Sequence, residues 1–258
     1  MRPADDAQAF FAALDVTAAR RDLVAVGGTL DAPTLVAAYR AGCVPWPSPS
    51  GDERSFARAA RRLVARRSLP LLAGTDGLVP WCSPDPRAVL LADGLVVRRS
   101  LRARLRGCGW TATVDAAFDE VVAGCADRES TWITDRMRQA YGALHRAPSA
   151  RASAHSVEVW DGEELVGGLY GVLVGRVFCG ESMFHRRTDA SKVALVELCH
   201  RLLDAGVRLV DTQQETEHMA SLGQVAVRRS DYLQVRGALR DEAVGLDPAR
   251  LPVARLAP

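Results

Sequence analysis

Two short segments carry four side chains that could form one site: two carboxyl groups for acid–base chemistry, an amide and an apolar thioether. Glu181 and Met183 lie two residues apart in GESMF, and Asp211 and Gln213 lie two residues apart in DTQ. Because side chains alternate along a strand, each pair is expected to point to one face of its strand. A buried carboxylate without a partner is costly, so Glu181 beside a thioether is unusual for plain core. We interpret this pair as a site for a group that is cationic at one end and apolar at the other.

The elements that carry these residues follow from residue alternation and turn signals. Residues 154–184 predict three antiparallel strands joined by tight turns, at 154–160, 165–174 and 177–184. A helix at 189–206 then leads to a strand at 208–213. Such a unit normally makes a right-handed crossover to a parallel neighbour. Asp211 and Gln213 therefore fall near the carboxyl end of a parallel strand, where open α/β sheets place their chemistry.

Capping residues mark the ends of several predicted helices. Asp31 and Thr134 precede apolar stripes at helical spacing, and Asp189 is predicted to cap the helix at 189–206. Residues 115–123 read as a further helix. From about residue 241 onward, the Pro- and Ala-containing chain is expected to be loosely held.

Two basic runs flank a rigid segment. Arginines recur every four residues from Arg54 to Arg66, which predicts a helix with one basic side. A solvated face and contact with phosphate are both compatible with that stripe. The second run lies between Arg98 and Arg106. Between the runs, within residues 78–87, the X-Pro steps at Ser83 and Asp85 favour extended backbone, which suits a domain boundary or a fixed wall beside a cleft.

Composition excludes several classes of protein. The chain has 258 residues, of which 48% are hydrophobic and 25% charged, with a net charge of +2, which is typical of a soluble globular protein. It has no apolar run of membrane-spanning length, and residues 1–10 lack a signal-peptide core, so neither export nor membrane insertion is expected. The six scattered cysteines contain no C-x-x-C pair, which favours reduced cytosolic thiols and no metal site.

Other chemistries fit the sequence less well. No Ser-His-Asp order is evident, and His155 is interpreted as a core histidine satisfied by hydrogen bonds. Cys179 is the one candidate acyl-accepting thiol, but core packing is the better interpretation because nothing nearby in sequence would lower its pKa. The glycines of residues 166–171 lie inside a predicted strand rather than before a helix, which weighs against a phosphate-cradling loop for acetyl-coenzyme A.

Ten segments, in this order, resemble leucyl/phenylalanyl-tRNA–protein transferases: DLVAVGGTL, AYRAGCVPW, WCSPDPRAVL, TWI, AHSVEVW, LVGGLYG, GESMF, ASKVAL, DTQ and SLG. The resemblance spans residues 22–239. It implies an α/β (α+β) fold, with a small N-terminal domain and a GNAT-like acyltransferase domain built on a mixed, largely antiparallel sheet. The implied boundaries are 1–88, with an Arg-rich insertion near 47–78, then 89–242 and a C-terminal tail at 243–258.

The resemblance also implies an activity. The family moves Leu, Phe or Met from an aminoacyl-tRNA to the α-amino group of proteins that begin with Arg or Lys, which marks them for degradation in an N-degron pathway. It implies a cytoplasmic enzyme without cofactor or metal, and we expect a monomer. A GNAT-type N-acetyltransferase that uses acetyl-coenzyme A and a non-catalytic tRNA-binding protein are the alternatives.

Site residues carry over motif by motif. Glu181, Asp211 and Gln213 match the family's catalytic positions. Residues implied in substrate binding are Trp46, Trp132, Phe178, Met183 and Ser191, and Arg99 and Arg102 match the family's basic region near the tRNA acceptor arm. Arg58 and Arg62, on the predicted basic helix outside the family's usual pattern, are further candidates for tRNA binding. Phe178 and Met183 have opposite parity on a straight strand, and a bulge at Gly180 would reconcile them. Cys82, where the family usually has a second Trp, and Thr212, in place of Cys in DCQ, depart from the pattern.

These roles suggest a mechanism. We expect Glu181 to pair with the acceptor's guanidinium or ammonium group, and Gln213, oriented by Asp211, to hold the attacking amine. A neutral amide is too weak to be a general base, so either Asp211 or the terminal ribose of the tRNA must accept the proton. Met183 would adapt to Leu, Phe and Met side chains without separating them sharply.

Overall fold

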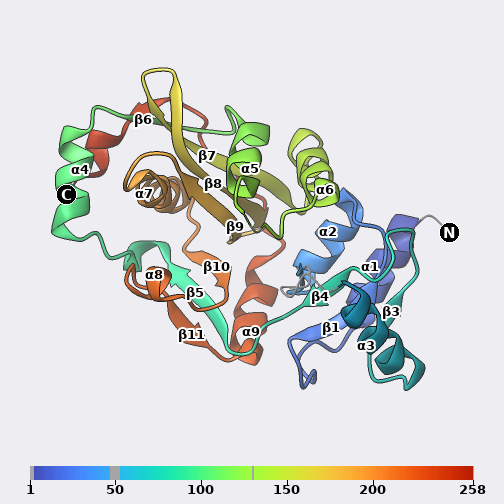
Figure 1. Cartoon of the computed structure of the whole chain (residues 1–258). Coiled ribbons are helices and arrows are strands. Elements are labelled where there is room, and N and C mark those ends of the chain that lie inside the picture. Colours follow the sequence, from blue (N-terminus) through green and yellow to red (C-terminus); the bar gives the residue numbers. More distant parts are fainter. Residues whose placement is uncertain (1–2, 47–52, 130, 258) are drawn as a thin grey trace.

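A computed structural model describes residues 3–46, 53–129 and 131–257, and the side chains from residue 6 onward within these ranges. The first six residues of the predicted Arg-rich insertion, 47–52, lie outside the described residues. Two β-sheets organise the described chain (Figure 1). The division between them falls at the X-Pro steps of Ser83 and Asp85, after Cys82 and before Arg87.

The smaller sheet has four short strands in the order β2-β4-β1-β3. Its strands are β1 (Leu23–Gly27), β2 (Val44–Pro45), β3 (Leu71–Leu72) and β4 (Pro80–Cys82). Three helices accompany it: α1 (Pro3–Ala13), α2 (Ala32–Arg40) and α3 (Glu53–Ala65). The Asp31 carboxylate accepts a hydrogen bond from the Thr34 backbone N–H at 2.9 Å, which confirms the predicted N-cap of α2.

The larger sheet has eight strands in the order β11-β5-β10-β9-β8-β7-β6-β12. Its strands are β5 (Arg87–Leu91), β6 (Thr111–Val114), β7 (Ser153–Asp161), β8 (Glu164–Val174), β9 (Val177–His185), β10 (Leu209–Gln213), β11 (Val225–Val227) and β12 (Leu251–Pro252). Only β9 and β10 pair in parallel, and the other neighbours are antiparallel. The predicted meander, the parallel crossover and the mixed sheet are thereby confirmed, whereas the GNAT-like detail stays a prediction.

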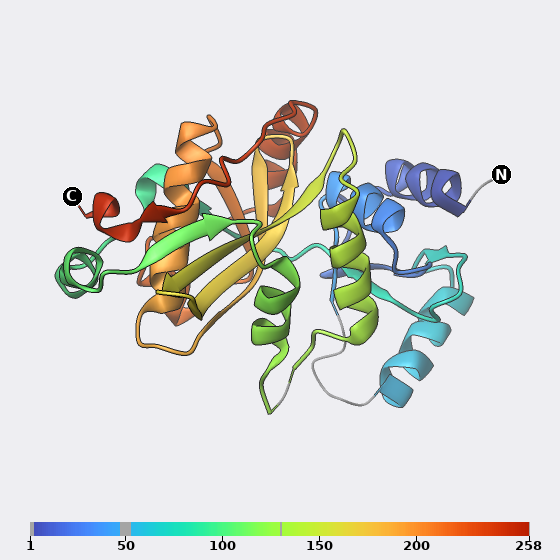
Figure 2. The same cartoon turned by 90° about the horizontal axis from the view of Figure 1, so that it is seen from above.

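Helices cover both faces of this sheet (Figure 2). They are α4 (Arg99–Gly107), α5 (Phe118–Ala126), α6 (Asp135–Arg146), α7 (Ala190–Asp204), α8 (Glu217–Ala220) and α9 (Arg229–Leu239). Alternate strand residues pack under α7 on one face and under α5 and α6 on the other, so the core forms two main apolar clusters. Among the described residues, none of the helices combines the length and the apolar character needed to cross a bilayer.

Two helix starts differ in detail from the prediction. Thr134 caps α6 as expected, through a hydrogen bond to its hydroxyl from the Met137 N–H. Asp189 stands at the N-cap position of α7 but has a left-handed backbone (φ +70°) and makes no side-chain cap. Its carboxylate instead pairs with Lys192 at 2.9 Å. The helix predicted at 115–123 begins only at Phe118, because Asp115 adopts φ +62° in the preceding turn.

The C-terminal segment is not loosely held, so that expectation is wrong. Strand β12 pairs with β6, and the 3₁₀ helix Val253–Leu256 that follows buries Val253 and Leu256 in the cluster under α7. Arg255 also reaches the buried Glu197 carboxylate at 2.6 Å. Burial of apolar side chains offsets the entropy that a Pro- and Ala-containing tail would otherwise retain. The domain boundaries at 88 and 242 stay predictions.

Candidate active site

A bulge in β9 sets the direction of its polar and apolar side chains. Tyr170 pairs with Ser182 and the next residue, Gly171, pairs with Gly180, so Glu181 is an extra residue without a partner on β8. The bulge predicted at Gly180 is therefore present at the next residue, Glu181. It has two consequences, one for the apolar residues of the strand and one for Glu181.

The first consequence is that Phe178 and Met183 share one side of the sheet. Phe178 is buried in the cluster under α7, and Met183 packs against the same cluster. Glu181 lies on the opposite side, where it meets α6. The expectation that Glu181 and Met183 share a face is therefore wrong, because the extra residue reverses the alternation between them.

The second consequence is an under-satisfied carboxylate. The Tyr141 hydroxyl donates to Glu181 Oε2 at 2.9 Å, and the Tyr39 and Tyr141 hydroxyls lie 2.7 Å apart. Glu181 Oε1 is buried and has no hydrogen-bond partner among the described residues. Burial raises the pKa of Glu181 to about 7, although the hydrogen bonds from Tyr39 and Tyr141 act in the opposite direction. A cation beside Oε1 would restore the charged form.

Asp211, by contrast, is completely engaged. Arg87 makes a bidentate pair with it, Nε to Oδ1 at 2.8 Å and Nη2 to Oδ2 at 2.6 Å. The Tyr232 hydroxyl donates to Oδ2 at 2.8 Å, and the Gln213 N–H donates to Oδ1 at 3.0 Å. Burial alone would raise the pKa of Asp211, but the Arg87 guanidinium outweighs it and holds this pKa below its ordinary value. Asp211 is thus an anion that orients its neighbours, and neither of its oxygens is free to accept a proton.

Gln213 sits in a second bulge, on β10. The register with β5 shifts between Asp211 and Gln213, and Gln213 has φ +59°. A left-handed backbone at a residue other than glycine is uncommon and is concentrated at functional sites. The Nε2 group donates to the Asp211 carbonyl at 3.2 Å, which leaves the side-chain oxygen without a hydrogen bond to the described residues. That oxygen is an acceptor suited to an amine N–H.

The two bulges are neighbours. Strands β9 and β10 pair only over residues 177–179 and 209–211, so both irregularities follow directly after the last paired residues. Asp211 pairs with Cys179 across the two strands, and Glu181 follows Cys179 by two residues. Glu181, Asp211 and Gln213 are therefore brought together where the parallel strands part.

Two tryptophans from distant segments also meet. Trp46 follows β2 and Trp132 precedes α6, and their rings are parallel to within 2° with centroids 6.5 Å apart. Both side chains are partly buried. Flat, partly exposed indole rings are surfaces on which a nucleobase stacks.

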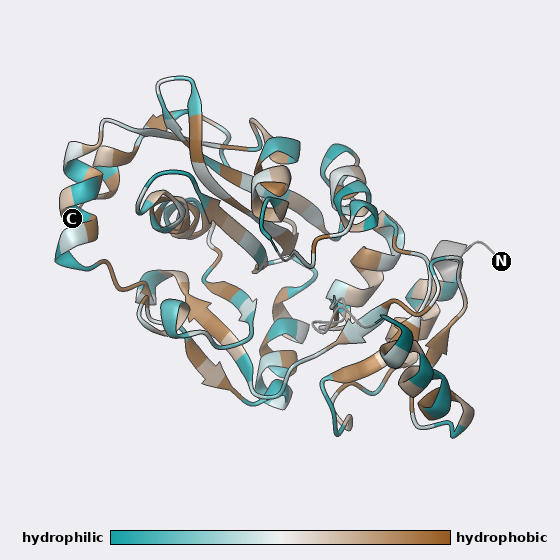
Figure 3. Ribbon diagram, viewed as in Figure 1, coloured by the Kyte–Doolittle hydropathy of each residue, from teal (hydrophilic) through white to brown (hydrophobic). Residues whose placement is uncertain are grey.

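The remaining predicted residues are more dispersed. Ser191 is buried in the first turn of α7. Arg99 and Arg102 lie on α4 and are exposed, as are Arg58 and Arg62 on the largely hydrophilic α3 (Figure 3). Helices α3 and α4 lie at opposite ends of the molecule in both views, so the fold does not bring the two basic runs together (Figures 1 and 2).

His155 and Cys179, which were interpreted from the sequence as core residues, have structural roles. His155 Nδ1 lies 2.7 Å from the Asp115 carboxylate and its Nε2 lies 2.7 Å from the Ser153 hydroxyl, so it is satisfied by hydrogen bonds as expected. Cys179 is buried, and burial raises the pKa of its thiol well above the ordinary value. It packs beside the site as an unreactive thiol.

The sequence interpretation missed four contributors: Arg87, Tyr39, Tyr141 and Tyr232. All four are buried, and each touches Asp211 or Glu181 directly or through one hydroxyl. One signal was available for Arg87, since it ends the rigid segment that was interpreted as a wall beside a cleft. The tyrosines fall on apolar helix stripes and look like ordinary core.

The chain is similar in sequence to proteins of one known family. The family model for leucyl/phenylalanyl-tRNA protein transferase matches residues 89–236. A leucyl/phenylalanyl-tRNA–protein transferase from Shewanella pealeana is 40% identical over 232 residues, which are 88% of this chain and 86% of its own. The enzyme of that name from Shewanella baltica is 39% identical over 231 residues, with 88% and 84% covered.

Among solved structures, L-PGS from Bacillus licheniformis matches with a TM-score of 0.40 and 10% identity, over 84% of this chain and 80% of its own. That similarity is too low to support an argument. The family model covers more than half of the chain, and the relatives align with most of it. The chain therefore belongs to the leucyl/phenylalanyl-tRNA–protein transferase family.

Proposed function

We propose that the protein transfers Leu, Phe or Met from an aminoacyl-tRNA to the α-amino group of a protein that begins with Arg or Lys. The observation that carries this proposal is the half-buried Glu181, whose Oε1 lacks a partner among the described residues, together with the Gln213 side-chain amide, which donates to the Asp211 carbonyl. A guanidinium or ammonium group placed at Oε1 would form a charge-assisted hydrogen bond. The cytoplasmic N-degron role and the monomeric state belong to the same proposal.

The acceptor would bind with its basic side chain at Glu181 and its α-amino group at the side-chain oxygen of Gln213. Positioning is the main requirement, because an aminoacyl ester is already activated and an α-amino group with a pKa of about 7.7–8.0 is partly neutral near pH 7. Arg87 and Tyr232 support this step indirectly, since they hold the Asp211 carboxylate that orients Gln213.

In the transfer step the amine nitrogen attacks the ester carbonyl carbon. The new C–N bond forms as the bond between that carbon and the ribose oxygen breaks, and the tRNA leaves with a free 3′-hydroxyl. Both oxygens of Asp211 already accept two hydrogen bonds each, and its pKa is lowered. We therefore assign the proton to the departing ribose oxygen rather than to Asp211.

The donor would be held by its apolar side chain and by its base. Phe178 and Met183 lie on one side of the sheet through the bulge, and a thioether adapts to Leu, Phe and Met alike. The parallel rings of Trp46 and Trp132 offer stacking surfaces for the terminal adenine. Ser191 is proposed at the edge of this donor site.

The rest of the tRNA would contact basic helices. Because α3 and α4 stand at opposite ends of the molecule, a single short stem cannot use both in the same way. We propose that Arg99 and Arg102 on α4 contact the acceptor arm and that Arg58 and Arg62 on α3 contact a more distant part of the tRNA.

The test is a reconstituted transfer reaction. Purified protein, labelled leucyl-tRNA and a peptide that begins with Arg are mixed, and label in the peptide is measured. Peptides that begin with Lys and with Ala serve as the positive and negative acceptors. Gln213→Ala should abolish transfer while tRNA affinity is retained, and loss of both would favour a non-catalytic tRNA-binding protein. Acetylation of the same peptide by acetyl-coenzyme A would instead favour an N-acetyltransferase.

A further inference from the structure

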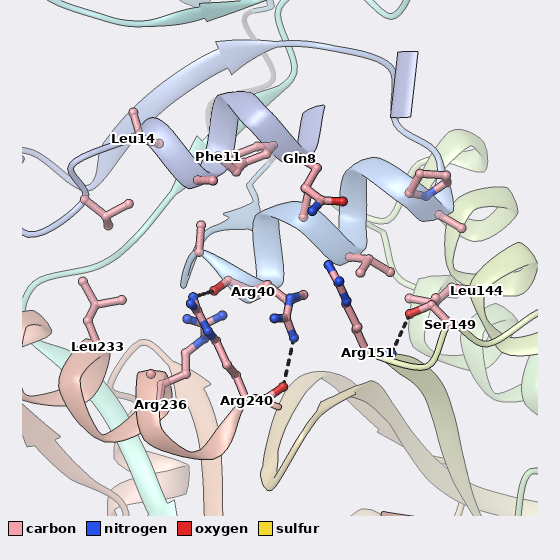
Figure 4. A pocket seen from close by; sticks show the side chains of 18 of the residues that line it. Gln8, Phe11, Leu14, Arg40, Leu144, Ser149, Arg151, Leu233, Arg236 and Arg240 are labelled. Atoms are coloured by element: carbon pink, nitrogen blue, oxygen red, sulfur yellow. Dashed lines mark hydrogen bonds between the residues drawn. The ribbon is translucent and has the colours of Figure 1, made fainter. Parts of the chain in front are cut away.

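A cavity lies beside the N-terminal helices α1 and α2. It has a volume of about 750 Å³ and is bounded by α1, α2, the residues that follow α6, and α9 (Figure 4). None of the residues proposed to bind donor, acceptor or tRNA lines it. Its size falls within the range of about 300–1,000 Å³ that is typical of small-molecule sites.

Part of its wall is apolar. Phe11 and Leu14 come from α1, Val36 from α2, and Leu233 from α9. In Figure 4, Phe11 and Leu14 lie above the group of arginines, whereas Leu233 lies beside Arg236. Such a wall would bury the apolar body of a ligand.

The basic part contains a guanidinium group without a counter-charge. Arg236 is only 2% exposed and lines the cavity. Its Nη2 donates to the Tyr39 carbonyl, its Nε has no hydrogen-bond partner, and no carboxylate among the described residues lies within ion-pair distance. A buried charge without a partner is costly, and burial accordingly lowers the pKa of Arg236. An anion in the cavity would supply the missing charge.

Further arginines surround this group. Arg40 pairs with Asp241 at 2.5 Å, and Arg240 Nε, which is buried without a hydrogen bond to the described residues, lies 3.8 Å from the same carboxylate. Arg151 is exposed, and its guanidinium makes no hydrogen bond or ion pair with the described residues. Among the described residues that line the cavity, Asp15 is the one acidic side chain against four arginines.

We propose that this cavity binds a small amphipathic organic anion, with its anionic head at Arg236 and Arg151 and its apolar body against Phe11, Leu14 and Val36. The ligand is suited to be an effector, because the cavity walls include α2, α6 and α9. These helices carry Tyr39, Tyr141 and Tyr232, the tyrosines that reach Glu181 and Asp211.

The experiment uses 8-anilinonaphthalene-1-sulfonate, an anion with an apolar body whose fluorescence rises in apolar sites. We expect saturable binding of one molecule per chain, with displacement by decanoate or by decyl phosphate. The competitor that displaces at lower concentration identifies a carboxylate or a phosphate as the preferred head group.

Four variants locate the probe. Val36→Trp should fill the cavity and abolish binding, and Arg151→Ala should weaken it about fivefold through loss of one charge-assisted contact. Arg146→Ala is the matched control, because Arg146 is exposed, pairs with Asp119 and does not line the cavity. Met183→Trp tests the donor site as the alternative location.

The proposal is overturned if probe binding survives Val36→Trp with unchanged affinity, or if Met183→Trp abolishes it instead. It is also overturned if Arg146→Ala weakens binding as much as Arg151→Ala does, since that result would indicate attraction by general positive charge. Far-ultraviolet circular dichroism of each variant verifies that the fold is retained, and Arg151→Ala, at an exposed position, keeps the test valid if Val36→Trp fails to fold.

Discussion

Replacement of Glu181 by Gln should make the protein more stable and less active at the same time. The amide has the shape of the carboxyl group and can still accept the hydrogen bond from the Tyr141 hydroxyl. It removes the charge that burial disfavours. The acceptor's cation would then lose its counter-charge, so transfer to a peptide that begins with Arg should fall.

The magnitude follows from the pKa. Burial raises the pKa of Glu181 from its ordinary 4.5 to about 7, and at about 1.4 kcal/mol per pH unit this difference corresponds to a cost of about 3 kcal/mol. Below pH 4.5 the carboxyl group is protonated in both folded and unfolded chains, so the cost is absent. It grows between pH 4.5 and 7 and is complete above pH 7. Water reaches the half-buried side chain, so we expect a gain of about 1–3 kcal/mol at pH 8.

Urea unfolding of wild type and Glu181→Gln at pH 5 and pH 8 measures this gain. Glu215→Gln, at an exposed position in a loop, is the matched control and should change stability at neither pH. A gain of equal size at both pH values, or a loss of stability at pH 8, would refute the argument, because neither result can come from ionisation of Glu181. Transfer that stays at the wild-type rate would refute its role in acceptor binding.

Three further predictions concern the partner of Asp211, the stacked tryptophans and the basic helices. Arg87→Met should destabilise the protein by about 3–5 kcal/mol in urea unfolding, because Asp211 is left buried and unpaired, and adding Asp211→Asn should recover part of the loss. Trp46→Ala should raise KM for aminoacyl-tRNA about tenfold while kcat changes little, which corresponds to the loss of one stacking surface. Arg62→Ala and Arg102→Ala should each lower the slope of log affinity for tRNA against log salt by about 1 if the side chain contacts a phosphate, and an unchanged slope removes that residue from the tRNA interface.

The local elements and the chemical types at the site follow from the amino-acid sequence alone. Strand alternation and tight turns gave β7, β8 and β9, and the caps Asp31 and Thr134 marked the starts of α2 and α6. These features depend on interactions between residues a few positions apart, so they can be seen in a linear pattern. The bulge near Gly180 was also predictable, because the parity of Phe178 and Met183 required an extra residue.

The groups that partner the reacting residues become known only from the folded chain. Arg87 and Asp211 are 124 residues apart, and nothing in either segment specifies the bidentate pair that fixes the carboxylate. The same holds for Tyr141, which reaches Glu181 from the opposite side of the sheet to Met183, and for the C-terminal segment, which is ordered by β6 and α7. Such contacts depend on how the sheets and helices close over one another, and local sequence patterns carry no information on that closure.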